Sequence, residues 1–245
     1  MSLQILVSGA TGAVGRNIVE VIESDDHLSL AGEATSRNFF EPDVEADVIV
    51  DFSHPDLFEH IVHFATRRRI PLVTGTTGLG QKRQCELYEA AESIAVCQAA
   101  NFSIGVTLMV QLADQATRAL GEDFDIEILE AHHRRKLDAP SGTALWLGET
   151  VAQARGQKLA DHAVNDRSQH RRARAPGEIG FQAIRGGDVA GEHTVYFLAD
   201  GERLELTHRA SDRRVFARGA LLAARRIIDE PAGLFDFSDL LLKAT

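Results

Sequence analysis

Short apolar runs alternate with segments of helical periodicity through the first hundred residues. After the first run, for example, apolar residues recur at Ile18, Val19 and Ile22, which is the spacing of one helix face. Strands that alternate with helices are typical of a parallel sheet covered on both faces, so we expect a doubly wound α/β domain. The expected strands are Leu3–Ser8, Leu28–Ala34, Asp47–Phe52, Ile70–Thr74 and Ile94–Gln98, with helices at Asp56–Arg69 and Gly80–Glu92.

The second half of the chain has a different periodicity. In Phe124–Ala131, apolar residues alternate through Ile126 and Ile128, as in a strand with one buried face. Glycine and aspartate at 186–188 and 200–201 supply turns between further strand-like runs. We therefore expect a second α+β domain with an open mixed sheet. Its strands are Phe124–Ala131, Gly177–Arg185, His193–Ala199 and Glu202–His208, and its helices are Gly105–Gly121 and Ala144–Ala154.

Three segments remain: a stretch with little periodicity, a last helix and an apolar tail. Gly156–Ala175 is polar and basic with little periodicity, so we expect an exposed loop. Phe216–Asp229 has the pattern of a final helix. Gly233–Leu242 is a mostly apolar tail, which must dock on another surface to leave water.

A glycine-rich turn joins the first expected strand to the first helix. Gly9, Gly12 and Gly15 follow the strand directly, in the spacing GxxGxxG rather than GxGxxG. Small residues let the backbone approach a pyrophosphate, and a helix start offers N–H groups and the positive end of its dipole. Gly75–Gly78 and Ala99–Ser103 end later strands, and one ligand spanning the three loops is the simplest interpretation. This favours a Rossmann-like dinucleotide site; the alternative is a turn used only for tight packing.

The end of the second strand bears on the choice of cofactor. In dinucleotide-binding folds an acidic residue here holds the ribose hydroxyls, whereas basic and hydroxyl side chains accept a 2′-phosphate. Glu33 comes slightly early, and Ser36 and Arg37 follow the strand, with Arg37 suited to pair with a phosphate. We therefore expect NADPH. If Glu33 instead faces the ribose, the protein uses NADH.

Five consecutive side chains, from His132 to Lys136, can carry positive charge. Such a run is often only a hydrated loop face. Its neighbours favour an anionic ligand instead: a strand precedes the run, and the Pro140–Thr143 turn that follows opens a helix, whose N-terminus attracts anions. A histidine, whose ordinary pKa lies near neutrality, is also placed to deliver a proton. The pattern predicts a site for a small, carboxylate-rich molecule.

Composition narrows the class of protein. The 245 residues carry a formal net charge of −10, with a sequence pI near 5.5, which argues against nucleic acid as a partner. We expect no membrane partner, because no apolar run approaches the ~20 residues that span a bilayer, and no secretory signal opens the chain. Cys85 and Cys97 are isolated, which predicts free thiols in a reducing cytoplasm. No metal is expected, because no carboxylate spacing completes a site around His132 and His133.

The chain carries a long run of specific motifs. Residues 130–144 read E-A-H-H-R-R-K-L-D-A-P-S-G-T-A. Others are G-A-T-G-A-V-G-R at 9–16, V-D-F-S-H-P at 50–55, G-T-T-G at 75–78, A-A-N-F-S-I-G-V at 99–106, I-R-G-G-D-V-A-G-E-H-T at 184–194, L-T-H-R-A-S at 206–211 and G-L-F-D-F at 233–237. Together they strongly resemble the 4-hydroxy-tetrahydrodipicolinate reductases, also called dihydrodipicolinate reductases, of bacterial lysine and diaminopimelate biosynthesis.

This resemblance implies NAD(P)H-dependent reduction of 4-hydroxy-tetrahydrodipicolinate to tetrahydrodipicolinate by a homotetramer. His132 matches the family's catalytic acid, and Lys136 shares in proton donation and substrate activation. The substrate carboxylates would be held by His133, Lys136, Ser141, Gly142 and Thr143. The cofactor would contact Gly9, Ala10, Thr11, Gly12, Ala13, Val14, Gly75, Thr76, Thr77, Ala99, Ala100, Asn101 and Phe102, in addition to Ser36 and Arg37.

The resemblance also implies a discontinuous dinucleotide-binding domain, made of residues 1–102 and 213–245, and a substrate-binding and oligomerisation domain at 103–212. The chain departs from the family pattern in two places. The segment between Arg37 and Asp47 is short where longer members carry an insertion, and Ser36-Arg37 replaces the usual acidic-arginine pair, which supports NADPH. Arg135 is assigned no role.

Two other functions stay open. One is another NAD(P)-dependent amino- or hydroxy-acid dehydrogenase of the same build, which would share the first half but lack the H-H-x-x-K cluster and the P-S-G-T turn. The other is a nucleotide-binding sensor without catalysis, which would bind the nucleotide but show no turnover.

Overall fold

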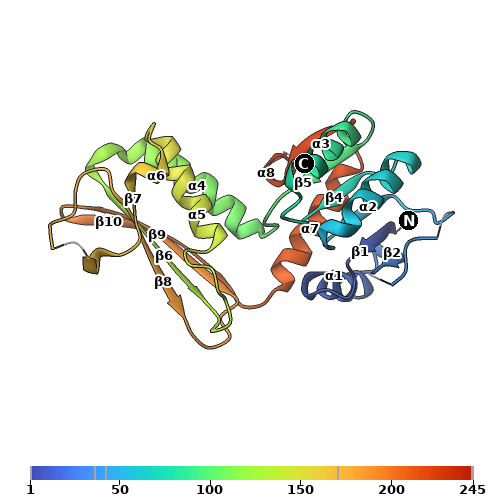
Figure 1. Ribbon diagram of the computed structural model, residues 1–245, viewed down its shortest axis with the longest axis horizontal. Helices are drawn as coiled ribbons and strands as arrows, with labels where there is room; N and C mark the ends of the chain where they lie inside the picture. Colours follow the sequence, from blue (N-terminus) through green and yellow to red (C-terminus); the bar gives the residue numbers. More distant parts are fainter. Residues whose placement is uncertain (1, 36, 42, 170, 244–245) are drawn as a thin grey trace. The chain divides into compact units, whose positions relative to one another are not determined.

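The chain divides into two compact units (Figure 1). A computed structural model describes residues 2–35, 37–41, 43–169 and 171–243, apart from the side chain of Gln169. The first unit combines the residues up to Ile104 with those from Arg213 onward, and the second is Gly105–Asp212. Over the part of the chain that is described, no helix has both the length and the apolar character needed to cross a membrane.

A parallel sheet forms the centre of the first unit. Within the described residues it has six strands in the order β11-β5-β4-β3-β1-β2, and every neighbouring pair runs parallel. Val48, Ile49 and Val50 of β3 are fully buried, as expected of an interior strand covered on both faces. The strands are β1 (Leu3–Ser8), β2 (Leu28–Ala34), β3 (Val48–Asp51), β4 (Leu72–Thr74), β5 (Ala95–Gln98) and β11 (Gly233–Asp236).

Helices cover both faces of this sheet (Figure 1). Val7 of β1 lies in one apolar cluster with Ile18 of α1 and with α7, whereas its neighbour Leu6 lies in another with Ile61 of α2 and with α3. Successive side chains of a strand point to opposite faces, so the two clusters lie on the two sides of the sheet. The predicted doubly wound arrangement is therefore confirmed. The helices are α1 (Ala13–Glu23), α2 (Pro55–Arg68), α3 (Gly80–Ala91), α7 (Arg214–Ile227) and α8 (Phe237–Leu241).

The C-terminal segment adds a strand to this sheet. β11 pairs in parallel with β5, from Gly233 opposite Ala95 to Asp236 opposite Gln98. The Asp236 carboxylate then accepts a hydrogen bond from the Ser238 N–H at 2.8 Å and caps α8. The sequence predicted that this tail must dock, but its four strand residues were too short a pattern to indicate a strand.

A mixed sheet forms the centre of the second unit. Within the described residues its five strands have the order β10-β9-β6-β8-β7; β6 runs parallel to β8 and antiparallel to β9. Helices α4 and α5 cover one face, where Met109 and Leu147 pack with Ile128 and Phe197. The predicted α+β domain with an open mixed sheet is confirmed. Its elements are α4 (Ile104–Leu120), β6 (Asp125–His132), α5 (Gly142–Ala154), α6 (Leu159–His162), β7 (Ala163–Val164), β8 (Ile179–Arg185), β9 (Gly191–Ala199) and β10 (Glu202–Ala210), with short 3-10 helices at Gly121–Asp123 and Arg167–Gln169.

The basic segment before β8 is fastened to the sheet. It contains α6 and β7, and β7 pairs in parallel with β8. Arg174 is mostly buried and bonds the carboxylates of Asp125 and Glu127, while Arg167 donates to Glu178 at 2.7 Å. The expectation of an exposed loop over 156–175 was therefore wrong for these arginines, because carboxylates at the edge of the sheet pair with them.

Helix α7 approaches the loop after β5 too closely for a side chain at one position. A Cβ on Gly219 would lie 1.7 Å from the carbonyl oxygen of Phe102, whose side chain is 1% exposed. Gly219→Ala should therefore lower the free energy of unfolding by about 1–3 kcal/mol or more, the usual cost of overpacking a core. Urea denaturation followed by circular dichroism measures this loss. The exposed Arg218→Ala on the same helix is the control, expected within about 0.5 kcal/mol of wild type; a Gly219→Ala protein as stable as the control would contradict the close packing.

Candidate active site

The glycine turn after β1 has room for backbone only. Gly9 has a φ of +79°, and a Cβ on it would lie 2.3 Å from the carbonyl oxygen of Phe52. A Cβ on Gly15 would lie 2.1 Å from the carbonyl oxygen of Gly9. Helix α1 then begins at Ala13 behind its N-cap Gly12, and the described residues provide neither a side-chain cap nor an acidic residue in its first turn. The N–H groups of this turn therefore suit a diphosphate.

A buried acid ties together the next two loops. Asp51 at the end of β3 is fully buried, and its carboxylate accepts from the hydroxyls of Thr74 at 2.9 Å and Thr76 at 2.8 Å. It also accepts from the Ser53 N–H at 3.2 Å. Sequence reasoning missed this residue, although an acid inside the apolar run D-V-I-V-D-F was a visible signal. Asp51 holds the loops after β3 and β4 in fixed positions at the carboxyl edge of the sheet.

Two hollows lie along this edge. One, of about 480 Å³, is lined by Ala13, Val14, Gly75, Thr76 and Thr77 together with residues 52–55. The other, of about 620 Å³, shares the two threonines and adds Ala99, Ala100 and neighbouring residues of α3 and β5. The fold therefore brings together the loops after β1, β4 and β5, from which most of the expected cofactor contacts come.

Four further residues that we expected to contact the cofactor do not line these two hollows: Ala10, Thr11, Asn101 and Phe102. Thr11 is exposed, whereas Ala10 is buried. The Phe102 ring packs in the core 5.0 Å from the ring of Phe237, so only its backbone remains for a ligand. The Asn101 side-chain oxygen accepts a hydrogen bond from the backbone of the same loop at 2.7 Å.

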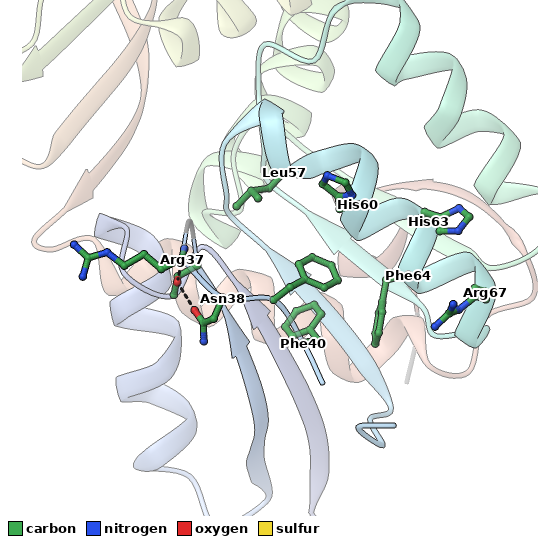
Figure 2. A pocket seen from close by; sticks show the side chains of 10 residues that line it. Arg37, Asn38, Phe40, Leu57, His60, His63, Phe64 and Arg67 are labelled. Atoms are coloured by element: carbon green, nitrogen blue, oxygen red, sulfur yellow. Dashed lines mark hydrogen bonds between the residues drawn. The ribbon is translucent and has the colours of Figure 1, made fainter. Parts of the chain in front are cut away.

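A basic and aromatic hollow adjoins the end of β2 (Figure 2). It has a volume of about 500 Å³ and lies between the loop after β2 and one side of α2. His60 and Arg67 project from α2 along it, and Phe40 packs on Phe64 with ring centres 5.3 Å apart. Aromatic walls with cations beside them suit a planar base that carries a phosphate.

Hydrogen bonds within the loop after β2 set its shape. The Thr35 N–H donates to the carbonyl of Asn38 at 2.9 Å, and the Arg37 N–H donates to the Thr35 hydroxyl at 3.2 Å. The Arg37 side chain is exposed and extends away from the aromatic rings (Figure 2). Ser36, the other expected phosphate contact, lies outside the described residues.

A buried carboxylate organises the site of the second unit. Side chains of β6 alternate between faces, so Glu130 and His132 share the face that the helices cover. Glu130 is 1% exposed and accepts from both terminal nitrogens of Arg185 at 2.7 Å. It also accepts from the Ser141 N–H at 3.1 Å, and its Oε2 lies 2.7 Å from His132 Nδ1. Donors on both oxygens make it possible to bury this charge.

The charges around His132 act on its pKa in opposite directions. Burial lowers the pKa of His132 most, the Glu130 carboxylate opposes this, and the cations of Lys136 and Arg185 lower it further; the net direction is down. For Glu130, burial alone would raise the pKa, but hydrogen bonds from Arg185 and His132 hold it below its ordinary value. His132 is therefore mostly neutral at pH 7 in the ligand-free protein, and a bound anion would favour its protonation.

The start of α5 adjoins the same carboxylate. Ser141 is the N-cap of α5: its hydroxyl accepts from the Ala144 N–H at 3.2 Å and lies 3.1 Å from His193 Nε2. Among the described residues, the buried Nδ1 of His193 has no hydrogen-bond partner. Burial lowers the pKa of His193 to about 4, with a further contribution from His132, so its ring is neutral at pH 7. The first turn of α5, which begins at Gly142, contains no acidic side chain.

The basic run separates into different environments. Lys136 is mostly buried and pairs with Asp138 at 2.8 Å. Arg134 and Arg135 are exposed, while the half-buried His133 accepts from the Arg135 N–H through Nδ1 at 3.2 Å. The hydrated-loop interpretation thus fits the two arginines, whereas the other members of the run are at least partly buried. In the described part of the chain, no group of three or more His, Cys, Asp or Glu side chains is arranged to hold a metal.

Sequence reasoning did not single out four members of this cluster: Glu130, Asp138, Arg185 and His193. Sheet pairing brings the distant ones in, since the register places His193 of β9 opposite Glu130 and Arg185 of β8 opposite His132. The signal for Glu130 was available. The alternation of Phe124–Ala131 puts it on the covered face, and a buried acid requires partners.

Both halves of the chain match models of one family. A model described as "Dihydrodipicolinate reductase, N-terminus" matches residues 3–102, and one described as "Dihydrodipicolinate reductase, C-terminus" matches residues 105–241. The chain belongs to the dihydrodipicolinate reductase family. Similar relatives include the 4-hydroxy-tetrahydrodipicolinate reductases of Halorhodospira halophila, 44% identical over 98% of this chain and 99% of that protein, and of Nitrosospira multiformis, 41% identical over 98% of each.

Solved structures share the fold of this chain. The dipicolinate-bound dihydrodipicolinate reductase from Paenisporosarcina sp. TG-14 has a TM-score of 0.79 at 22% identity, covering 96% of this chain and 98% of that one. A C. glutamicum DAP dehydrogenase in complex with DAP has a TM-score of 0.57 at 13% identity, covering 100% and 97%. At these identities the likeness shows the fold only. The reductase and the dehydrogenase both have this fold.

The buried His193 ring should make the second unit acid-sensitive. Its pKa is below that of an unfolded histidine, so the unfolded chain binds a proton that the folded one does not. Unfolding free energy should therefore fall as pH drops from about 6.5 towards 4, by about 3 kcal/mol for this group. Trp146, the single tryptophan and a residue of α5, reports urea unfolding of this unit.

In His193→Gln the fall in stability with pH should be shallower. The part that remains includes His132 and His208, whose pKa values burial also lowers, and the carboxylates of Glu130, Asp138 and Glu178, whose pKa values their partners lower. The comparison uses the slopes against pH, because the substitution also changes the contact with Ser141. Parallel slopes in wild type and variant would contradict a buried neutral ring.

Proposed function

We propose that this chain reduces 4-hydroxy-tetrahydrodipicolinate to tetrahydrodipicolinate with NAD(P)H, on the route to diaminopimelate and lysine. Family membership over nearly the whole chain supports this activity. The observation that carries it at the site is the imidazole of His132, backed by a buried carboxylate and set near the start of α5. Such a group can deliver a proton to a substrate that carries negative charge.

The substrate is a dicarboxylate, and the second unit offers two means of holding it. The start of α5, with Ser141, Gly142 and Thr143, provides backbone donors and the positive end of a helix dipole. Lys136 and His133 provide side-chain donors on the loop that precedes α5. Charge that builds on the substrate during reduction would be stabilised by the same groups.

The first unit fits a nicotinamide dinucleotide. We assign residues 1–102 and 213–245 to cofactor binding and 103–212 to substrate binding. The turn at Gly9–Gly15, where added side chains would collide with backbone, and the uncapped start of α1 support a pyrophosphate at this place. When bound, the cofactor supplies the hydride; this chain binds and orients it through the loops after β1, β4 and β5.

Protonation of the substrate falls to His132. Its Nδ1 faces Glu130, so Nε2 is the nitrogen that can reach a ligand. A dianionic substrate raises the pKa of a neighbouring imidazole, which opposes the lowering by burial. Lys136 assists by attracting the substrate and by favouring negative charge on it; its ammonium, which pairs with the Asp138 carboxylate at 2.8 Å, suits a carboxylate partner.

The preferred cofactor is NADPH. An exposed arginine that follows β2, with the histidines and Arg67 of the adjoining hollow, favours a ligand with an added phosphate. We also expect a homotetramer, on the family resemblance. We expect it in the cytoplasm, because Cys85 and Cys97 are free thiols. The alternative dehydrogenase does not fit a family match in both halves, and a sensor would not need a buried histidine–carboxylate pair.

Replacing the proton donor should affect turnover more than binding. His132→Gln should lower kcat by about 10²–10⁴-fold with a smaller change in KM, because a general acid acts in the transition state. Lys136→Met should lower kcat and also raise KM, because Lys136 holds the substrate as well. Steady-state oxidation of NADPH with enzymatically generated 4-hydroxy-tetrahydrodipicolinate measures both. Wild-type turnover in either variant would contradict its assigned role.

The cofactor preference rests on Arg37. Arg37→Ala should raise KM for NADPH about tenfold or more, the equivalent of one charge-assisted hydrogen bond, and leave KM for NADH within about twofold. NADH serves as the internal control, since both cofactors share every contact except the 2′-phosphate. Equal losses with the two cofactors, or a wild-type protein that prefers NADH, would contradict the preference.

A further inference from the structure

Glu130 contacts the proton donor but is itself buried. At 1% exposure it cannot reach a ligand in solution, and two of the groups around it, Arg185 and the Ser141 N–H, donate to it. Arg185 donates through two nitrogens at 2.7 Å, and the Ser141 N–H donates at 3.1 Å. A group whose partners include an arginine fork and a backbone N–H acts as an ionised acceptor.

From this geometry we propose that Glu130 is the positioning residue of the reaction. It fixes His132 with a proton on Nδ1 and presents Nε2 as the nitrogen that gives a proton to the substrate, while Arg185 keeps Glu130 ionised. The inference rests on the proposed function, because it assigns Glu130 a part in that reaction.

The contact at Nδ1 decides the tautomer of His132. An ionised carboxylate 2.7 Å away can only accept, so Nδ1 must carry a proton in both the neutral and the charged ring. In the charged ring the second proton is on Nε2. When that N–H bond breaks and the proton passes to the substrate, a neutral ring remains with its proton held by Glu130, ready to be charged again from solvent.

The neighbours of Nε2 on β9 are a glycine and an edge-on ring. Gly191 of β9 lies beside it, and a Cβ on this glycine would come within 3.1 Å of Nε2. The ring of His193, also on β9, lies with its centre 5.1 Å from that of His132, at an angle of 71°. Small and edge-on neighbours therefore border the nitrogen that must exchange its proton.

The charges that face His132 come from every element packed against it. Lys136 on the following loop and Arg185 on β8 disfavour a charged ring, and Glu130 on β6 favours it. His193 on β9 is neutral at pH 7, and His208 on β10 lies beyond it, opposite His193 in the sheet. Glu130 thus opposes both cations, and its removal should make the ring harder to protonate.

The same carboxylate also holds the anion-binding turn. Its Oε1 accepts from the Ser141 N–H, while Oε2 faces His132. Arg185 adds a bond to the carbonyl of Asp138 at 2.6 Å and so ties down the loop between the two. The proton donor and the start of α5 are therefore both held by Glu130, which fixes the spacing between them.

The tautomer can be read in the wild-type protein without any substitution. Nitrogen-15 chemical shifts of the His132 ring, followed against pH in the ligand-free protein, should show the neutral ring protonated on Nδ1. A neutral ring protonated on Nε2 would overturn the inference.

Glu130→Gln tests the role of the charge. The variant should lose the fixed tautomer, its His132 pKa should fall below that of wild type, and the alkaline limb of kcat/KM should move to lower pH. We expect kcat to fall about tenfold or more. The loss should not exceed the roughly 10²–10⁴-fold that the general acid itself contributes. Glu130→Asp, which keeps the charge, should restore the position of the alkaline limb even where kcat stays low.

Glu178→Gln is the matched control. Glu178 lies in the same unit and is a buried carboxylate held by Arg167 and Arg172, remote in sequence and contacts from His132. Its variant should show the wild-type pH profile. If the His132 titration is unchanged in Glu130→Gln, or shifts equally in Glu178→Gln, the inference about Glu130 is overturned and the proposed function is not. Wild-type protein that binds NADPH but does not reduce the substrate would overturn the proposed function instead.

Discussion

The site of the second unit depends on one ion pair, between the buried Glu130 and the partly buried Arg185. Removing one partner of such a pair typically costs about 3–5 kcal/mol, since the other charge is left without compensation. Here both carboxylate oxygens are also committed to the site, one to the Ser141 N–H and one to His132 Nδ1. The contacts that stabilise this carboxylate therefore also orient the His132 ring and the start of α5.

The first unit follows a more general constraint. Parallel strands bring their carboxyl ends to one edge, so the loops after β1, β4 and β5 lie together whatever their sequence. In this chain, side chains are excluded at Gly9 and Gly15 and the loops are fixed through Asp51, so that the edge suits a diphosphate. Asp51 and Glu130 thus play similar parts: each is a buried acid whose acceptor oxygens hold two loops in register.

The sequence predicted what local pattern determines. Alternation of strands and helices predicted the doubly wound sheet, and the turns at 186–188 and 200–201 indicated the mixed sheet. It did not predict the strand β11, whose four residues pair only because β5 presents an open edge, or the ion pairs that fasten the 156–175 segment. In the site it indicated His132 and Lys136 from their run of charges, but not Arg185 or His193, which only strand register brings to the cluster.

The most direct test of this account is a crystal structure of the protein with dipicolinate, an unreactive aromatic dicarboxylate. We predict one carboxylate on the backbone donors at the start of α5, Lys136 on the other, and His132 Nε2 facing the ring while Nδ1 stays on Glu130. A dicarboxylate bound away from α5, or a His132 ring turned so that Nε2 meets Glu130, would contradict the account.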